Sequence, residues 1–242
     1  QPLLRQYGID KPLLAVHQHN EAEAAGLVVE RLQRGERVAY VSDAGTPAVS
    51  DPGARLVAAV RAAGLKVMPL PGASSVTTVL SAAGVTRAEG SSDSGTSFVF
   101  AGFLPSKAGE RDEAIAALQR DTRAIVILEA PHRIEALARA MGVLQGRLIT
   151  VGRELTKQFE EIATIPAQDF AAWLAAGPQR TRGEFALVLH AASAFEGPDD
   201  STRVLKLLLA ELPLKTAVKL AADITGAPRN ELYDSALKLK NE

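Results

Sequence analysis

Residues 42–53 read SDAGTPAVSDPG and stand between an apolar run at residues 37–42 (RVAYVS) and a helical pattern at about residues 53–63. The apolar run predicts a buried strand, and the glycine- and proline-rich stretch predicts a turn from that strand into the helix. In open α/β sheets, ligands bind beyond the carboxyl ends of strands, where loop amides and helix N-termini are exposed. The stretch therefore predicts an α/β fold and the place of a ligand loop.

The residue types of this loop suit a ligand, although a plain turn explains them equally well. Ala44 and Gly45 are small enough to let a ligand approach the main chain closely. Three polar side chains could form hydrogen bonds with it: Asp43, Thr46 and Ser50. In the alternative interpretation, Ser50 or Asp51 only caps the following helix. No GxGxxG or GxxxxGK[ST] motif occurs, so a dinucleotide site or a P-loop lacks its signature.

The same rhythm of strand and helix surrounds the loop. A helix is predicted at residues 21–34, a strand at 65–70, and a helix containing residues 76–83. Between the last two lies a second glycine–proline loop, residues 70–75 (LPGASS), where Ser74 and Ser75 either reach a ligand or cap the helix. This βαβ order predicts a largely parallel sheet covered by helices.

A polar stretch at residues 87–96 predicts a domain boundary, after which the rhythm restarts. Strands are predicted at 98–103 (FVFAGF), 124–129, 147–154 and 184–190, and helices at 110–120, 132–144 and 169–176. A second linker, residues 197–201, precedes three short helices at 201–212, 214–225 and 229–240. We expect α/β domains at residues 1–90 and 97–192 and a helical appendage at 201–242. The appendage resembles a helix-turn-helix, but packing or dimerisation explains such a bundle more often than nucleic-acid contact.

Composition limits the possible chemistry. The 242 residues contain no cysteine, which excludes disulfides and thiolate metal sites, and the four histidines lack metal-ligand spacing, so we expect no metal. No apolar run is long enough to cross a membrane and no signal peptide is recognisable, which predicts a cytoplasmic protein. The net charge of −1 gives no global signal for nucleic acid, although a local cleft can still be basic.

Charged residues end two predicted strands of the second half, in residues 129–134 (EAPHRI) and 152–161 (GRELTKQFEE). Charges at strand ends are costly unless they act on a ligand or pair with each other. Glu129 with Arg133, and Arg153 with Glu154, can be simple ion pairs. Alternatively, the basic residues of this half form a local basic cleft: Lys107, Arg111, His132, Arg133, Arg153 and Lys157.

Six motifs in this order resemble the ribosomal RNA small subunit methyltransferase I family, a branch of the tetrapyrrole methylase superfamily. They are SDAGTPAVSDPG, PLPGASS, GFLPSK, EAPHR, RELTKQFEE and GEF, and the C-terminal residues 215–240 resemble the helical tail of that family. The resemblance covers nearly the whole chain. It implies two α/β/α domains with S-adenosyl-L-methionine bound in the cleft between them, a homodimer, and 16S ribosomal RNA as the substrate. The product it implies is a cytidine methylated on its ribose 2′-hydroxyl.

By position, the resemblance also assigns cofactor contacts. The first loop supplies Asp43, Ala44, Gly45, Thr46 and Val49, the second supplies Ser74 and Ser75, and Glu129 and Leu155 lie near later contacts. Members of the family begin with a strand, a TPIGN-like loop, a helix and an AEDTR-like stretch before the position of Gln1. We therefore expect part of the cleft to lie outside the given sequence.

The implied reaction is a displacement at a sulfonium methyl group, which depends on alignment of the acceptor oxygen and on loss of its proton. Candidates for the proton acceptor are Glu129, His132, Glu154 and Lys157, with Arg133 and Arg153 as phosphate-binding or orienting groups. Water can also accept the proton. Two other functions stay open at this point: a methyltransferase for a small tetrapyrrole-type molecule, and a non-catalytic protein that binds ribosomal RNA.

Overall fold

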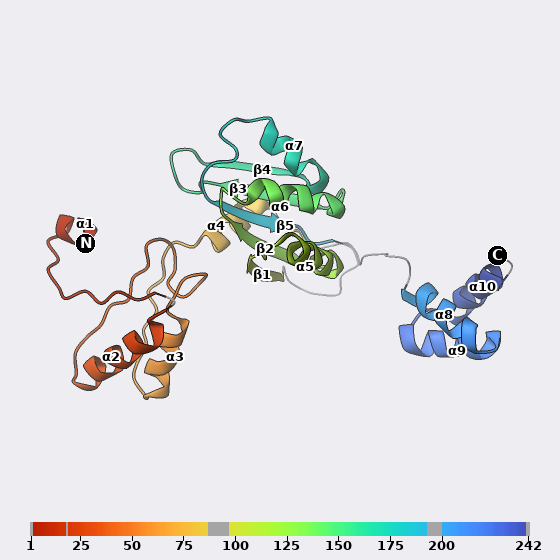
Figure 1. Ribbon diagram of the computed structural model, residues 1–242, viewed down its shortest axis with the longest axis horizontal. Coiled ribbons are helices and arrows are strands. Elements are labelled where there is room, and N and C mark those ends of the chain that lie inside the picture. The colour runs from red at the N-terminus through yellow and green to blue at the C-terminus, as the bar shows by residue number, and fades with distance from the viewer. Residues whose placement is uncertain (1, 18, 87–96, 193–199, 241–242) are drawn as a thin grey trace. The chain divides into compact units, whose positions relative to one another are not determined.

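The computed structural model describes residues 2–17, 19–86, 97–192 and 200–240 (Figure 1). The chain divides into two compact units. One contains residues 1–119 and 123–192, and the other contains residues 193–242 with residues 120–122. The predicted linker at residues 87–96 lies outside the described residues, as does most of the linker at 197–201.

A five-stranded sheet organises the larger unit. Its strands are β1 (Phe98–Phe103), β2 (Ala124–Glu129), β3 (Leu148–Arg153), β4 (Glu161–Pro166) and β5 (Phe185–Leu189), in the order β1-β2-β5-β3-β4. Only β1 and β2 are parallel; the other three pairs are antiparallel. The sheet is therefore mixed rather than largely parallel as predicted. The sequence pattern also missed β4, whose residues EIATIP follow the charged segment directly.

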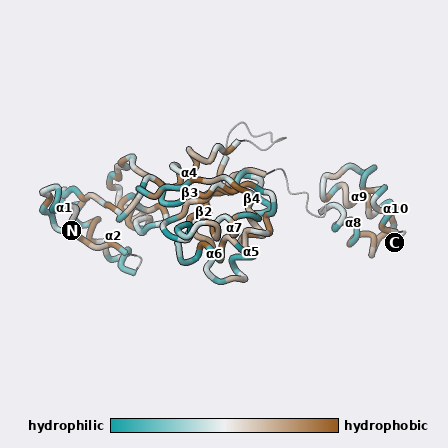
Figure 2. Tube along the Cα trace, turned by 90° about the horizontal axis from the view of Figure 1, so that it is seen from above, coloured by the Kyte–Doolittle hydropathy of each residue, from teal (hydrophilic) through white to brown (hydrophobic). Residues whose placement is uncertain are grey.

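Alternating side chains of the sheet form two cores. On one face, β2, β3 and β5 pack with α5 (Ala108–Arg120), α6 (Ile134–Met141) and α7 (Phe170–Ala175). On the other face, alternate residues of β2 and β5 pack with α4 (Ser75–Ala83). The 3-10 turns Gly142–Leu144 and Ala167–Asp169 extend α6 and lead into α7. Apolar residues accordingly colour the central strands brown in Figure 2. These elements confirm the α/β class, with helices on both faces of a sheet.

The N-terminal part contains α1 (Pro2–Gln6), α2 (Glu21–Gln33) and α3 (Ala54–Ala62). Helices α2 and α3 pack through a small core that includes Val28 and Val60. The strands predicted at residues 37–42 and 65–70 are wrong for this structure, since neither segment forms a ladder with another described residue. An extended apolar segment becomes a strand only beside a hydrogen-bonding partner. Without one, Val41 is 73% exposed and Leu70 is 79% exposed.

The smaller unit is a bundle of three helices, as predicted: α8 (Asp200–Glu211), α9 (Leu214–Thr225) and α10 (Arg229–Lys240). Its core includes Leu205, Val218 and Leu232. Helix α9 begins after Pro213 and ends at Gly226, which takes the left-handed conformation with φ of 75°. The two predicted breaks between the helices are therefore confirmed.

Candidate functional site

One end of the sheet gathers the charged motifs of the second half. Glu129 ends β2 and Arg153 ends β3, and both are register partners of Phe185, where β5 begins. Strands β2 and β3 run in the same direction because each is antiparallel to β5. The segments after β2 and β3 and the segment before β5 therefore meet at a single edge, which we call the charged sheet end.

Glu129 lies almost completely buried there, with 2% of its surface exposed. Its Oε1 accepts a hydrogen bond from the Ala130 amide at 2.8 Å and pairs with Arg133 Nε at 3.1 Å. Its Oε2 is buried without a hydrogen-bond partner in the described part of the chain. Burial raises the pKa of the Glu129 carboxyl, against the opposing effects of the Ala130 amide and Arg133. This geometry matches the simple ion pair that the sequence allowed.

Arg133 also donates to the Leu104 carbonyl, and Arg111 donates from Nη1 to the Ser106 carbonyl at 3.3 Å. Two guanidinium groups thus hold consecutive parts of the segment that follows β1. Lys107, in the same segment, pairs with Glu110 on the surface. His132 stands apart from these contacts: its side chain is exposed and has no hydrogen-bond partner among the described residues.

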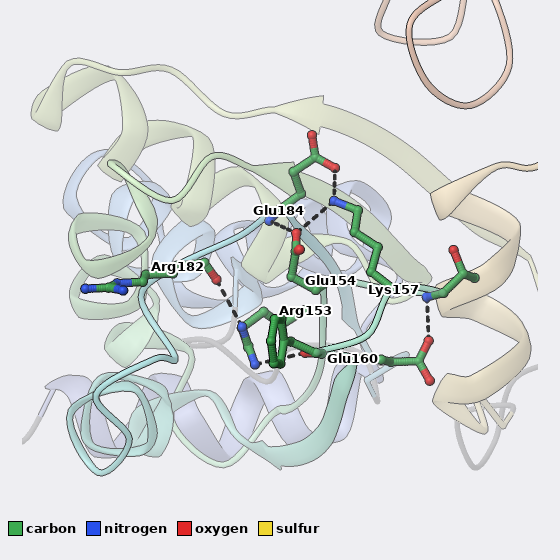
Figure 3. Close-up of polar contacts among 8 residues, drawn as sticks. Arg153, Glu154, Lys157, Glu160, Arg182 and Glu184 are labelled. Atoms are coloured by element: carbon green, nitrogen blue, oxygen red, sulfur yellow. Dashed lines mark hydrogen bonds and ion pairs between the residues drawn. The ribbon is translucent and has the colours of Figure 1, made fainter. Parts of the chain in front are cut away.

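Arg153 is 8% exposed and holds the main chain of two neighbouring segments. It donates to the Phe159 carbonyl at 2.9 Å and to the Arg182 carbonyl at 3.3 Å (Figure 3). Its Nε lies 3.5 Å from a carboxylate oxygen of Glu161, without hydrogen-bond geometry. The anticipated pair of Arg153 with Glu154 is replaced by these contacts. Arg153 therefore positions the chain, and its guanidinium faces inward.

Glu154, Lys157 and Glu184 form a compact cluster, shown in Figure 3. Lys157 Nζ donates to Glu154 Oε1 at 2.8 Å and to Glu184 Oε2 at 2.9 Å, and the Glu184 amide donates to Glu154 Oε1 at 2.9 Å. The hydrogen bond from Lys157 lowers the pKa of Glu154, and that same bond raises the pKa of Lys157. Lys157 is thereby held protonated and Glu154 ionised.

Gly183 permits this cluster to close. With φ of 88° it adopts a conformation that favours glycine, and an added Cβ would meet the Glu154 side chain at 2.4 Å. The three residues of the sequence motif GEF thus have separate roles. Gly183 allows the close approach of Glu154, Glu184 pairs with Lys157, and Phe185 is the register partner of both Glu129 and Arg153. Composition and spacing gave no sign of the roles of Glu184 and Gly183, although the motif itself was visible.

The two glycine–proline loops, residues 42–53 and 70–75, contact each other; we call them the ligand loops. Thr46 Oγ1 donates to the Ala73 carbonyl at 3.0 Å, and a Cβ at Gly45 would lie 3.8 Å from that carbonyl oxygen. Gly45, Ala48 and Ser50 all have positive φ. Asp43 and Val49 are exposed, as is Ala44. The structure therefore brings the two glycine–proline loops into contact.

Capping alone does not explain these loops. The amides of Gly53 and Arg55 at the start of α3 donate to Glu21 Oε1 at 2.8 Å each, so the cap comes from α2 rather than from Ser50 or Asp51. These bonds, chiefly the one from Gly53, lower the pKa of Glu21. Ser74 occupies the N-cap position of α4, but its hydroxyl forms no capping hydrogen bond. The sequence gave no local signal for Glu21, which lies 32 residues before Gly53.

Leu155 connects the charged sheet end with α4. It packs against the core that contains Val76 and Val79 of α4 and Val188 of β5. Ser75 begins α4, directly before Val76. Leu155 and the second ligand loop therefore border the same face of the sheet, as their common assignment requires.

Within the described ranges, no three histidine, aspartate or glutamate side chains are grouped to hold a metal ion. No helix in the described residues has the length and apolar character needed to cross a bilayer.

Comparisons with known proteins agree on the family. The family model of tetrapyrrole (corrin/porphyrin) methylases matches residues 2–171, and the model of the RsmI C-terminal HTH domain matches residues 196–240. A Pseudomonas aeruginosa protein named ribosomal RNA small subunit methyltransferase I is 44% identical over 98% of this chain and 83% of its own length. A Neisseria meningitidis protein of the same name is also 44% identical, over 99% of this chain and 81% of its own length.

Among solved structures, a diphthine synthase has the same fold, with a TM-score of 0.55 at 15% identity, covering 78% of this chain and 72% of that one. At this low sequence identity, the similarity shows only that the two proteins share a fold. The chain belongs to the tetrapyrrole methylase family of S-adenosylmethionine-dependent methyltransferases, and within it to the ribosomal RNA small subunit methyltransferase I proteins.

Proposed function

We propose that this protein transfers a methyl group from S-adenosyl-L-methionine to the ribose 2′-hydroxyl of a cytidine in 16S ribosomal RNA. The observation that carries the proposal is the pair of ligand loops, joined by the bond from Thr46 to Ala73 and retaining unused polar groups. The names of the relatives supply the class of RNA. The cytidine and the 2′-oxygen come from the resemblance of the six motifs.

The ligand loops suit this cofactor because their groups match its parts. Asp43 carries a carboxylate with no hydrogen-bond partner among the described residues, suited to ribose hydroxyls or an ammonium group. Gly45 lets a flat ligand approach the main chain, and the Ser74 hydroxyl forms no capping bond. We assign cofactor contacts to these residues and to the others predicted from the resemblance: Ala44, Thr46, Val49, Ser75 and Leu155.

When bound, the cofactor supplies a methyl group on a positively charged sulfur, an electrophile that needs no metal activation. The residues of the chain then have to align the acceptor oxygen and receive its proton. Glu129 is too buried to touch a substrate in this arrangement, and Arg133 and Arg153 hold main-chain carbonyls. We therefore assign these three residues to positioning the segments around the site.

The proton acceptor favoured by the geometry is His132. The raised pKa of Lys157 keeps it protonated, and its ammonium already donates to Glu154 and Glu184, while the lowered pKa of Glu154 makes that carboxylate a weak base. His132 is exposed on the segment after β2, and histidine is the side chain that most often serves as a general base. Loss of the imidazole in His132→Ala should lower kcat about 100-fold or more, with cofactor affinity retained.

The experiment that tests the function offers labelled S-adenosylmethionine to small ribosomal subunits and, separately, to tetrapyrroles. We expect label on 16S RNA, and digestion followed by mass analysis should find it on a cytidine ribose. Label on a tetrapyrrole alone would replace the proposal with small-molecule methylation. Cofactor binding without transfer to either substrate would contradict it as well.

We also propose the wider setting that accompanies this function. The protein acts in the cytoplasm, where ribosomal subunits are present, and works as a homodimer. The α/β domains at residues 1–90 and 97–192 would enclose the cofactor cleft, with the helices of residues 201–242 as an appendage. Sedimentation of the protein should give twice the mass of one chain, and a monomer at working concentrations would contradict the dimer.

A further inference from the structure

Arg182 is the arginine of the charged sheet end whose guanidinium has no partner in the described residues. Three neighbouring cations are engaged: Arg153 with carbonyls, Lys157 with two glutamates, and Arg180 with Glu161 at 2.8 Å. Arg180 also stacks on the Trp173 ring, 4.2 Å from its centroid. The side chain of Arg182 is exposed, and Figure 3 shows its guanidinium directed away from the cluster.

The acidic residues nearby have internal partners as well. Glu154 and Glu184 hold Lys157, and Glu161 holds Arg180. The fourth acid, Glu160, accepts a hydrogen bond from the Thr156 amide at 2.6 Å. No carboxylate of the cluster is therefore paired with Arg182, which leaves its charge available to an external anion.

The main chain that carries Arg182 is held in place on both sides. Its carbonyl accepts the hydrogen bond from Arg153, and the next residue, Gly183, lies against Glu154. The Glu184 amide then donates to Glu154. A free cation on a restrained backbone loses less conformational entropy on binding than a cation on a mobile loop.

Arg182 also lies close to the candidate site in register. It precedes Phe185 by three residues, and Phe185 is the register partner of both Glu129 and Arg153. The segment with His132 follows β2 at the same edge. A ligand that reaches this edge can therefore meet Arg182.

From these observations we propose that Arg182 binds a phosphate group of the RNA substrate. This inference rests on the proposed function. A planar guanidinium pairs with phosphate through two parallel hydrogen bonds, and RNA offers a phosphate at every nucleotide. S-adenosylmethionine has no phosphate, but its carboxylate is the competing anion, so cofactor affinity has to be measured alongside RNA affinity.

The test replaces Arg182 with glutamine, which retains polarity and part of the side-chain length but removes the charge. RNA affinity is measured with a fluorescein-labelled single-stranded RNA across a series of salt concentrations, and cofactor affinity by calorimetry. Arg182→Gln should weaken RNA binding about five- to tenfold and reduce the slope of log K against log salt by about 0.7. Cofactor affinity and the thermal transition should stay at wild-type values.

Two matched variants identify the cause of any effect. Arg139→Gln removes an exposed arginine from the last turn of α6 and should leave the RNA affinity and the salt slope unchanged. Arg180→Gln removes an internally paired arginine and should lower the thermal transition instead. Arg182→Lys should recover part of the affinity and the full salt slope, since it restores a single point charge.

The possible results separate this inference from the proposed function. If wild-type protein methylates 16S RNA and Arg182→Gln binds RNA with the wild-type affinity and salt slope, the phosphate contact is wrong and the function stands. A loss of cofactor affinity in Arg182→Gln would instead assign the arginine to the cofactor carboxylate and overturn the inference. If the wild-type protein neither binds nor methylates RNA, the proposed function fails first.

Discussion

The ligand loops and the charged sheet end both carry polar residues but use them differently. In the ligand loops, the Asp43 carboxylate has no hydrogen-bond partner among the residues that the structure describes, and the Ser74 hydroxyl forms no capping bond to α4. At the charged sheet end, Arg153, Lys157 and Glu154 are each held by two or more internal contacts. A charged motif in a sequence can therefore belong to a structural scaffold as readily as to a binding surface. Polar groups without internal hydrogen bonds distinguish the binding surface from the scaffold.

The largest effect should come from closing the space beside Glu154. Gly183→Ala places a methyl group 2.4 Å from the Glu154 side chain at a φ of 88°, so it should destabilise the fold by about 2–4 kcal/mol and lower Tm. Gly109→Ala is the control, because its Cβ meets nothing within 4 Å and it lies in α5. If the two variants were equally stable, the charged sheet end would tolerate rearrangement and would not act as a structural scaffold.

The ligand loops should respond in affinity rather than in folding. Gly45→Val introduces a bulky side chain where close approach of the cofactor is expected, and we expect at least about a tenfold loss of S-adenosylmethionine affinity by calorimetry. Gly64→Val introduces comparable backbone strain, at a φ of 73° compared with 68°, away from both loops. Its cofactor affinity should be normal, and a normal affinity in Gly45→Val would remove this loop from the site.

A smaller effect concerns Glu154 and depends on pH. Its pKa is lowered in the folded protein, chiefly by Lys157, so its stabilising contribution is present above the ordinary glutamate pKa of 4.5 and is lost as pH falls through the folded pKa. Because Lys157 is 47% exposed, Glu154→Gln should cost only about 1 kcal/mol near neutral pH.

Chemical denaturation at several pH values checks this, with Glu113→Gln on α5 as the control. The difference between wild type and Glu154→Gln should shrink as the solution becomes more acidic than the ordinary carboxyl pKa. A constant difference at every pH would show that the pair with Lys157 does not stabilise the charged sheet end.

The smallest effect should arise at the opposite end of the sheet, outside both regions. His190 Nε2 lies 2.7 Å from Thr150 Oγ1, and burial lowers the pKa of His190, helped by Arg147. The unfolded chain takes up this proton near the ordinary histidine pKa of 6.5, so this contribution to stability is complete above that pH and falls as the pH drops below it. His190→Gln should reduce this loss of unfolding free energy by about 0.5 kcal/mol, and Tm measured across the pH range should vary less than in the wild type. An unchanged pH profile in His190→Gln would exclude His190 as its source.

Sequence reasoning predicted the elements that are set by local pattern and missed those set by partners. The runs that became β2 and β5 are almost wholly apolar, and the breaks at Pro213 and Gly226 depend on single residues. Strand pairing is not local: residues 37–42 have a strand pattern without a ladder, whereas β4 pairs with β3 despite its weak pattern. The direction of β5 likewise depends on its neighbours on both sides.

For the candidate site, the motifs were identified from the resemblance, and the structure shows which contacts the residues of each motif make. Glu129 with Arg133 was foreseen as an ion pair, and its burial follows from the position at the end of β2. Lys157 was foreseen as a base or a phosphate contact, but its two glutamate partners come from segments 3 and 27 residues away. Such long-range partners leave no periodic signal in a single sequence.

The carboxylate of Glu21 has a consequence for how the first ligand loop can change. One oxygen atom on α2 receives the amides of both Gly53 and Arg55, so the downstream end of the loop is fastened to a different helix. In the middle of the loop, residues 43–50, Thr46 bonds to the Ala73 carbonyl, and Ser42 bonds locally to the carbonyls of Ala44 and Gly45. Under the proposed function, substitutions in residues 43–50 should change the ligand preference while the start of α3 stays in place, and a change at the buried Glu21 of α2 should alter ligand affinity from a distance.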